Sequence, residues 1–411
     1  MASRAAPKSS KKPAKAASRK ASAGAAPASP WSGFHKRSRA DRLALVARHG
    51  RLTAAESKVL GSAAGLGHGL AGSFIENAAG AFPLPLGLAV GFVVDGRDVV
   101  VPMAVEESSV VAAASHGAKM AAAGGGFTTE AGAPVTIGQV ELRDVDDPEA
   151  AALVVERNAA AWAATADRSI ASMVRRGGGV RGIVARPLPE HRRLVVHLHV
   201  DTRDAMGANA VNSLCESLGP AIAKAVGGRL GLRILSNLAT ERIVRARCTV
   251  PAEAVGGKGV VRAMVEANEF ALADPYRAAT HNKGILNGID PVAIATGNDW
   301  RALEAGAHAY AALGGRYKAL TQYSRTGAGD LRAELALPVA VGTVGGVTRL
   351  HPTAAVCLKL LGAPDATGLA RILAAVGLAQ NLSALRALSA EGIQAGHMAL
   401  HSSNLRLAKR A

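Results

Sequence analysis

The stretch PVTIGQVELRDV, residues 134 to 145, opens the part of the chain that decides the fold. Apolar and polar residues alternate along it, as in a strand with one buried face. A long helical pattern follows at 149–176 and stops at three consecutive glycines, 177–179. Later patterns predict two strands, a helix and a last strand, at 180–188, 193–202, 208–226 and 229–235.

This β-α-β-β-α-β order predicts a small ferredoxin-like unit, an antiparallel sheet with helices on one face. The flanking residues, 31–133 and 237–390, have mainly helical patterns, although a hairpin is expected at 88–103 around the turn Asp95-Gly96. The expected fold class is therefore α+β, a large helical domain with a small unit inserted at 134–236. Residues 391–411 form a short C-terminal segment.

Positive charge is concentrated at the N-terminus of this 411-residue chain, whose formal net charge is +17. Residues 1–30 contain no acidic residue and seven basic ones: Arg4, Lys8, Lys11, Lys12, Lys15, Arg19 and Lys20. Such a Lys/Ala/Ser/Pro segment cannot bury enough apolar surface to fold. We therefore expect a disordered basic tail, without a secretory signal, that makes at most weak contacts with polyanions.

The cysteines and the apolar runs indicate the compartment. Three isolated cysteines, Cys215, Cys248 and Cys357, have no metal-ligand spacing and cannot form a closed disulfide set. The best membrane candidate, 71–94, is interrupted by Glu76, Asn77 and prolines. We expect a cytoplasmic protein with no bound metal and no membrane span.

One stretch, HNKGILNGIDPVAIATGNDWRALEAGAHAYA at 281–311, gathers chemically active side chains. Lys283 stands among glycines that allow tight turns, and its ammonium is suited to hold developing negative charge on an oxygen. The alternative is a solvated loop lysine, with Asp299 capping a helix that begins at Trp300.

A second stretch, DAMGAN at 204–209, follows a strand and opens a helix. Free N–H groups at a helix N-terminus favour an anion such as a dinucleotide phosphate, and a plain strand-to-helix turn is the alternative. No glycine-rich segment has the spacing of a phosphate loop or of a dinucleotide fingerprint.

Two further positions are ambiguous. Glu106 and Glu107 fall in the first turn of a helix expected at 105–123, where acids interact favourably with the helix dipole. His397 and His401 have the spacing of one helix face, but no third metal ligand accompanies them. His397 is suited to donate a proton, although a histidine packed on a helix surface fits equally well.

Taken together, the chain resembles the soluble class II type of 3-hydroxy-3-methylglutaryl-coenzyme A reductase from about Phe34 to Asn404. The motifs that carry the resemblance are long: Ile75-Glu76-Asn77, DGRD at 95–98, VEE at 105–107, DAMGAN at 204–209, LRILSNLA at 232–239, DPYRAATHNKG at 274–284, TGNDWRA at 296–302, VGLAQNL at 376–382 and EGIQAGHMALH at 391–401.

The resemblance implies an oxidoreductase of isoprenoid metabolism that interconverts the thioester with mevalonate and free coenzyme A. Lys283 is implied to hold the oxyanion, Asp299 to keep Lys283 charged, Glu107 to donate a proton to the aldehyde, and His397 to protonate the coenzyme A thiolate. Implied substrate contacts are Ser109, Arg277, Asn287, Gln380, Glu76 and Asn77. Implied dinucleotide contacts are Asp204, Met206, Gly207, Ala208, Asn209 and Asn237.

The resemblance also implies that 31–133 and 237–390 bind the thioester, that 134–236 bind the dinucleotide, and that two subunits share each active site. NADH or NADPH is the expected cofactor, with NADH slightly preferred, although Ile170 stands where NADH-using relatives have an acid. The chain ends at Ala411, where relatives continue as a helical flap. The alternative expectation is therefore a protein that binds coenzyme A or acyl-coenzyme A with impaired turnover.

Overall fold

The computed structural model describes residues 29–62, 66, 68–390 and 392. The chain divides into two compact units, 1–37 and 38–411. In the described part of the first, a 3-10 helix (η1, Phe34–Lys36) packs Phe34 edge-on against Trp31. Residues 1–28 of the predicted tail, and His397 with nearly all of the C-terminal segment, lie outside the described residues.

The predicted hairpin is confirmed. Strands β1 (Leu86–Val94) and β2 (Arg97–Ala104) pair antiparallel around Asp95 and Gly96, both of which have positive φ. Two residues with positive φ make the hairpin turn that follows the twist of its strands.

A four-stranded antiparallel sheet is built entirely from residues 135–236, where the inserted unit is predicted. Its strands lie in the order β5-β6-β4-β7. Their bounds are β4 (Val135–Arg143), β5 (Gly179–Leu188), β6 (Arg193–Asp201) and β7 (Arg229–Ser236). This order is that of a ferredoxin-like unit, in which the first and third strands lie side by side in the centre.

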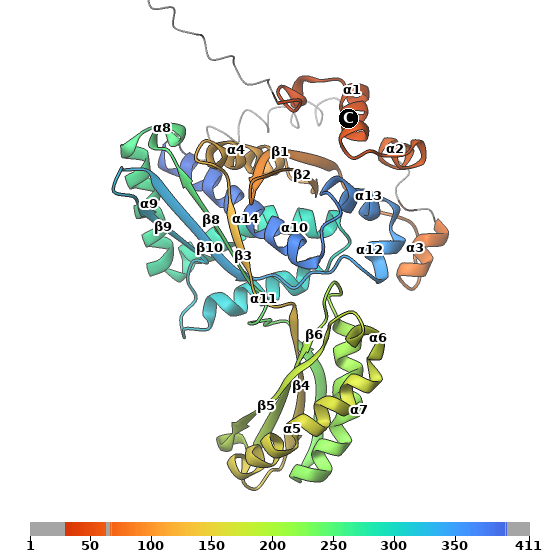
Figure 1. Cartoon of the computed structure of the whole chain (residues 1–411). Helices are drawn as coiled ribbons and strands as arrows, with labels where there is room; N and C mark the ends of the chain where they lie inside the picture. The colour runs from red at the N-terminus through yellow and green to blue at the C-terminus, as the bar shows by residue number, and fades with distance from the viewer. Residues whose placement is uncertain (1–28, 63–65, 67, 391, 393–411) are drawn as a thin grey trace, which may run out of the picture. The chain divides into compact units, whose positions relative to one another are not determined.

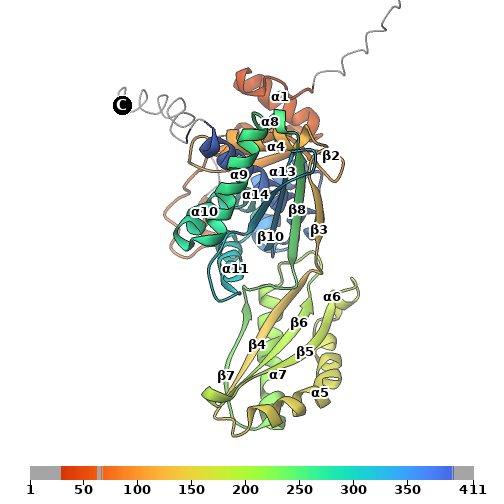
Figure 2. The ribbon, with the colours of Figure 1, turned by 90° about the vertical axis from the view of Figure 1, so that its left-hand side faces the viewer.

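Two helices cover one face of that sheet. They are α5 (Pro148–Ser169) and α7 (Ala208–Val226), and Figure 2 shows the four strands in front of them. Val196, Leu198 and Leu214 are fully buried between the two layers. The alternation along the central strand β6 therefore supplies one side of the core of this unit.

The prediction of a single helix over 149–176 is wrong in its extent. The chain leaves helical geometry at Ile170, whose φ is −113°, and a single turn, α6 (Ala171–Val174), follows. Ile170 is half-buried and packs against the core of this unit.

The flanking residues form a second four-stranded antiparallel sheet, with strand order β3-β8-β10-β9. Its strands are β3 (Thr128–Ala131), β8 (Ile243–Val250), β9 (Thr321–Arg325) and β10 (Leu331–Pro338). Of these four strands, only β10 coincides with a strand-like pattern in the sequence, at 330–344. The chain is a mixture of helices and antiparallel sheets, which confirms the α+β fold class.

Two long helices, α4 (Val110–Ala122) and α14 (Ala366–Ser389), pack beside this sheet, and a third, α10 (Pro275–Ala295), packs against α14 (Figure 1). They approach closely through glycines. A Cβ on Gly117 of α4 would lie 1.9 Å from the Ala379 carbonyl oxygen of α14, and one on Gly288 of α10 would lie 2.9 Å from that of Val376. Helix α14 is long and apolar enough to cross a membrane, but 83% of its most apolar window is buried within the protein, as in a core helix.

The remaining helices complete the described chain. They are α1 (Arg39–His49), α2 (Ala54–Gly61), α3 (His68–Phe74), η2 (Pro189–His191), α8 (Ala252–Val255), α9 (Lys258–Ala273), α11 (Trp300–Ala312), α12 (Gly346–Leu350) and α13 (Pro352–Leu360).

A pair of acids lies between α10 and α11. Asp290 Oδ1 is buried and has no hydrogen-bond partner among the described residues. Burial and the neighbouring charge of Glu304 raise the pKa of Asp290. The folded protein thus keeps a proton that the unfolded chain releases above the ordinary aspartate pKa near 4, so stability falls as the pH rises.

We predict that Asp290→Asn removes this loss, because an amide does not ionise. The melting temperature of the variant, measured from about pH 5 to about pH 9, is expected to decline less steeply than that of the wild type, and the variant is expected to be the more stable at the alkaline end. Parallel declines in the two proteins would contradict this assignment.

Candidate active site

The stretch 281–311 is helical rather than a glycine-rich loop. Helix α10 runs through Lys283, Gly284 and Gly288, and only Gly297, in the turn before α11, has positive φ. Asp274 begins α10, since its side chain accepts hydrogen bonds from the N–H groups of Tyr276 and Arg277. The loop interpretation of Lys283 is therefore wrong, and this residue is held by a rigid helix.

A cavity of about 620 Å³ is bounded by residues of α4, α10 and α14 and of the segment before α4. Six of the predicted site residues line it: Glu107, Ser109, Arg277, Lys283, Asn287 and Gln380. They come from three distant parts of the sequence. The contacts among the three helices therefore bring the predicted thioester site together.

Among the described residues, Lys283 forms an ion pair with Glu107. The Nζ of Lys283 lies 3.6 Å from Glu107 Oε2, with the two side chains 62% and 45% exposed. Glu107 precedes α4, which begins only at Val110. The interpretation that Glu106 and Glu107 stabilise a first helical turn is therefore wrong, and Glu107 instead places a carboxylate beside the lysine.

A buried polar network lies behind the cavity wall. His281 Nε2 lies 2.5 Å from Thr321 Oγ1 and 3.2 Å from Asn381 Nδ2, and Tyr323 donates to Asn381 Oδ1. Burial, together with the charge of Arg277, lowers the pKa of His281 to about 3. Burial also lowers the pKa of Arg277. His281 is thus neutral at physiological pH, while the ordinary pKa of arginine is high enough for Arg277 to stay charged.

Sequence reasoning missed several residues of this wall. They are Thr280, His281, Asn381, Ser383 and His116, whose Nδ1 lies 3.2 Å from Ser383 Oγ. Helical spacing from Arg277 would have identified His281 and Gly284 on the same face. The glycines at 284 and 288 concealed that periodicity.

Other predicted residues do not line this cavity. Asp299 caps α11 by accepting from the Ala302 N–H at 3.2 Å, and it lies 3.4 Å from Arg301 Nε. Glu76 and Asn77 are exposed after α3. His397 lies outside the described residues.

The predicted dinucleotide loop joins β6 to α7. Gly207 has a φ of 91°, and a Cβ there would lie 2.3 Å from Thr202 Cγ2, so only glycine fits. No side chain caps the helix at Gly207. The first N–H groups of α7, including those of Ala208 and Asn209, are therefore suited to an anion. Met206 is half-buried, and Asn237 is exposed at the end of β7.

The chain is similar to known proteins along most of its length. The family model of hydroxymethylglutaryl-coenzyme A reductase matches residues 38–402. The reductase of Archaeoglobus fulgidus is 48% identical over 375 residues, covering 91% of this chain and 86% of the relative. The probable reductase of Borreliella burgdorferi is 33% identical, covering 80% of this chain and 76% of the relative.

A solved structure is also similar to this chain. The class II reductase of Streptococcus pneumoniae, determined bound to NADPH in open conformations, has a TM-score of 0.85 and 41% identity, covering 87% of this chain and 99% of that one. The chain is an oxidoreductase that shares this fold. It belongs to the hydroxymethylglutaryl-coenzyme A reductase family.

Proposed function

We propose that this enzyme interconverts 3-hydroxy-3-methylglutaryl-coenzyme A with mevalonate and free coenzyme A in two nicotinamide-dependent steps. The observation that carries the proposal is the juxtaposition of Lys283 and Glu107, 3.6 Å apart, on the wall of one cavity. The family match over residues 38–402 supports the reaction.

Each side chain has a distinct role in this proposal. Bound reduced nicotinamide supplies the hydride for each reduction. Lys283 stabilises the negative charge that develops on the substrate oxygen. Glu107, from the same wall, donates a proton to the aldehyde oxygen in the second reduction. His397 protonates the coenzyme A thiolate released between the two reductions.

The same wall is suited to hold the glutaryl end of the thioester. Arg277 is half-buried on α10, two turns before Lys283, and its guanidinium matches a carboxylate with two parallel hydrogen bonds. Ser109, Asn287 and Gln380 present shorter polar groups to the cavity, and Gln380 Oε1 is buried without a partner among the described residues. A ligand hydroxyl would satisfy that oxygen.

The dinucleotide is assigned to the loop 204–209, where α7 presents its N-terminus. A relative of 41% identity is described as bound to NADPH, which supports use of NADPH here. Ile170 packs against the core of the small unit, so this residue gives no ground for a choice between cofactors. The slight preference for NADH stays a prediction.

The test is the loss of reduced-nicotinamide absorbance with the thioester and each cofactor in turn. Thioester-dependent oxidation supports the reductase. Saturable binding of the thioester without oxidation would favour the alternative, a coenzyme-A-binding protein with impaired turnover. The proposed compartment is the cytoplasm, which suits the three buried free cysteines.

A homodimer is part of the same proposal. Ile75 and Phe82 are 59% and 89% exposed on either side of Glu76 and Asn77, which do not line the cavity of their own chain. A second copy of the chain would cover these apolar side chains. Glu76 and Asn77 of the first copy would then lie at the thioester site of the second copy.

We predict that Phe82→Asp weakens self-association by about 30-fold or more, the cost of about 2 kcal/mol that is typical of an aromatic interface anchor. Analytical ultracentrifugation of the variant measures this change. Leu153→Asp, at a residue on α5 that is 57% exposed, is the matched control. Equal dimerisation of both variants would contradict the assignment of this segment to the interface.

A further inference from the structure

The predicted dinucleotide loop is fastened to the flanking domain through its backbone and one carboxylate. The Asp204 carbonyl accepts hydrogen bonds from the N–H groups of Thr343, at 2.8 Å, and Val344, at 3.3 Å. Its Oδ1 accepts from the Ala366 N–H at 3.0 Å, in the first turn of α14. One residue of the small unit thus contacts two separate elements of the large domain.

Gly342 makes this approach possible. A Cβ on Gly342 would lie 2.5 Å from the Met206 nitrogen and 3.0 Å from the Asp204 carbonyl oxygen. Both atoms belong to the backbone, so neither can move without displacing the loop. The φ of Gly342 is not positive. The residue is therefore glycine for close contact rather than for backbone conformation.

The opposite side of this segment contacts the turn that precedes α11. The Gly342 N–H donates to Asn298 Oδ1 at 2.8 Å, and Asn298 Nδ2 donates to Thr296 Oγ1 at 3.0 Å. Asn298 is the neighbour of Asp299. A single residue, Gly342, therefore lies between the dinucleotide loop and the turn that presents Asp299.

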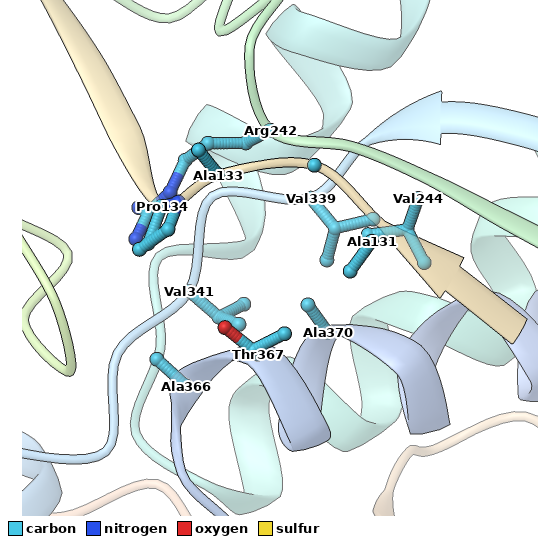
Figure 3. Close-up of a pocket in the computed structure, with 11 residues that line it drawn as sticks. Ala131, Ala133, Pro134, Arg242, Val244, Val339, Val341, Ala366, Thr367 and Ala370 are labelled. Carbon is cyan, nitrogen blue, oxygen red and sulfur yellow. The ribbon is translucent and has the colours of Figure 1, made fainter. Parts of the chain in front are cut away.

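A buried cation supports the same loop. The Nη1 and Nη2 of Arg242 donate to the carbonyls of Met206 and Ala205 at 3.5 and 3.4 Å. Arg242 is 4% exposed. Figure 3 shows Arg242 at a small cavity, where Pro134, in the connection between β3 and β4, lies near the first turn of α14. The dinucleotide loop, the connection at Pro134 and the first turn of α14 thus lie close to Arg242.

We propose that Gly342 and Asp204 are positioning residues, which form a latch that holds the dinucleotide loop in register with the Asp299 turn. This inference rests on the proposed function for the identity of the dinucleotide. Displacing the loop moves the N-terminus of α7, the proposed phosphate site, relative to Asp299. The cavity that Lys283 and Glu107 line is formed by α4, α10 and the C-terminal half of α14. The contacts among these helices do not involve the loop. Loss of the latch therefore acts on the dinucleotide rather than on the thioester.

The first test is Gly342→Ala. The methyl group pushes the loop outward by a fraction of an ångström or more, and displacements of about 1 Å cost up to about 100-fold in turnover. We expect kcat/KM for NADPH to fall by about 10- to 100-fold, with a matching rise in the Kd for NADPH from nicotinamide fluorescence. The KM for the thioester should stay within about twofold of the wild-type value. Gly314→Ala, at a position with open space around its Cβ, is the matched control and should leave all three values unchanged.

The second test separates the latch from a direct contact of the Asp204 charge with the cofactor. Asp204→Asn keeps an oxygen that accepts from the Ala366 N–H, whereas Asp204→Ala removes it. Asp365 still caps α14 in both variants, since its Oδ1 accepts from the Gly368 N–H at 2.6 Å. We expect the alanine variant to bind NADPH about 10-fold more weakly than the asparagine variant does.

The outcomes are separable. Binding of NADPH in Gly342→Ala equal to that in Gly314→Ala would overturn the latch, as would equal losses in the two Asp204 variants. If Gly342→Ala does not fold, the comparison of NADPH binding by Asp204→Asn and Asp204→Ala tests the latch by itself. A wild type that binds NADPH but does not oxidise it with the thioester would refute the proposed reaction and leave these binding comparisons intact.

Discussion

Lys283→Ala is expected to lower kcat by about 10²- to 10³-fold, the cost of removing one preorganised group that stabilises an oxyanion. Lys283 lies within α10 and is 62% exposed, and alanine is the best helix former. The variant should therefore keep the wild-type melting temperature and lose the reaction. Steady-state rates and thermal unfolding of the same preparation measure both effects.

Lys119→Ala is the matched control for this substitution. Lys119 is exposed on α4 and does not line the cavity, so its loss should leave the rate unchanged. A well-folded Lys283→Ala protein with the rate of the control would remove the lysine from the proposed chemistry.

Glu107→Gln is expected to be the second large effect. Glutamine keeps the shape of the side chain but has no acidic proton to transfer, and general acid catalysis by a positioned side chain contributes about 10²- to 10⁴-fold. Because the proposed proton transfer belongs to the second reduction, reduction of the free aldehyde should slow more than cleavage of the thioester. Parallel assays with the thioester and with the aldehyde measure the difference.

Glu106→Gln tests whether this effect depends on position. Glu106 is exposed, neighbours Glu107 and does not line the cavity. We expect wild-type kinetics from this variant. Similar losses in the two variants would mean that the negative charge of the segment, rather than a proton from Glu107, supports the reaction.

The small unit is the part of the fold that the sequence predicts most closely. Its clearest strand is β6, along which Leu194, Val196, Leu198 and Val200 alternate and point into the core. Each strand is also bounded by a turn or a helix. Alternation over eight or more residues specifies a face without reference to distant parts of the chain, and the order of the elements then specifies the sheet.

The strands of the larger domain are harder to predict, for two physical reasons. Strand β9 has only five residues, too few to establish a period. Strand β8 alternates well, but its partners β3 and β10 lie more than 80 residues away in sequence. A sheet of such distant strands is specified by tertiary contacts, which local patterns do not report.

The candidate site could likewise be predicted from the sequence only in part. The motifs identify Lys283, Glu107, Arg277 and Gln380, and the structure brings these four residues to one cavity. The helical setting of Lys283 escaped prediction because glycine is a poor helix former. Gly288 is nevertheless needed where α10 meets the backbone of α14. The contacts of Gly342 with two distant segments likewise cannot be predicted from any local sequence pattern.

The most direct test of the proposed reaction is its stoichiometry in the wild type. Reduced nicotinamide consumed and thiol released are measured together, with limiting thioester, by absorbance and by a thiol reagent. We predict that two equivalents of nicotinamide are oxidised for each equivalent of free coenzyme A, because the thioester passes through an aldehyde to an alcohol. Thiol release without nicotinamide oxidation, or binding of the thioester with neither, would contradict it.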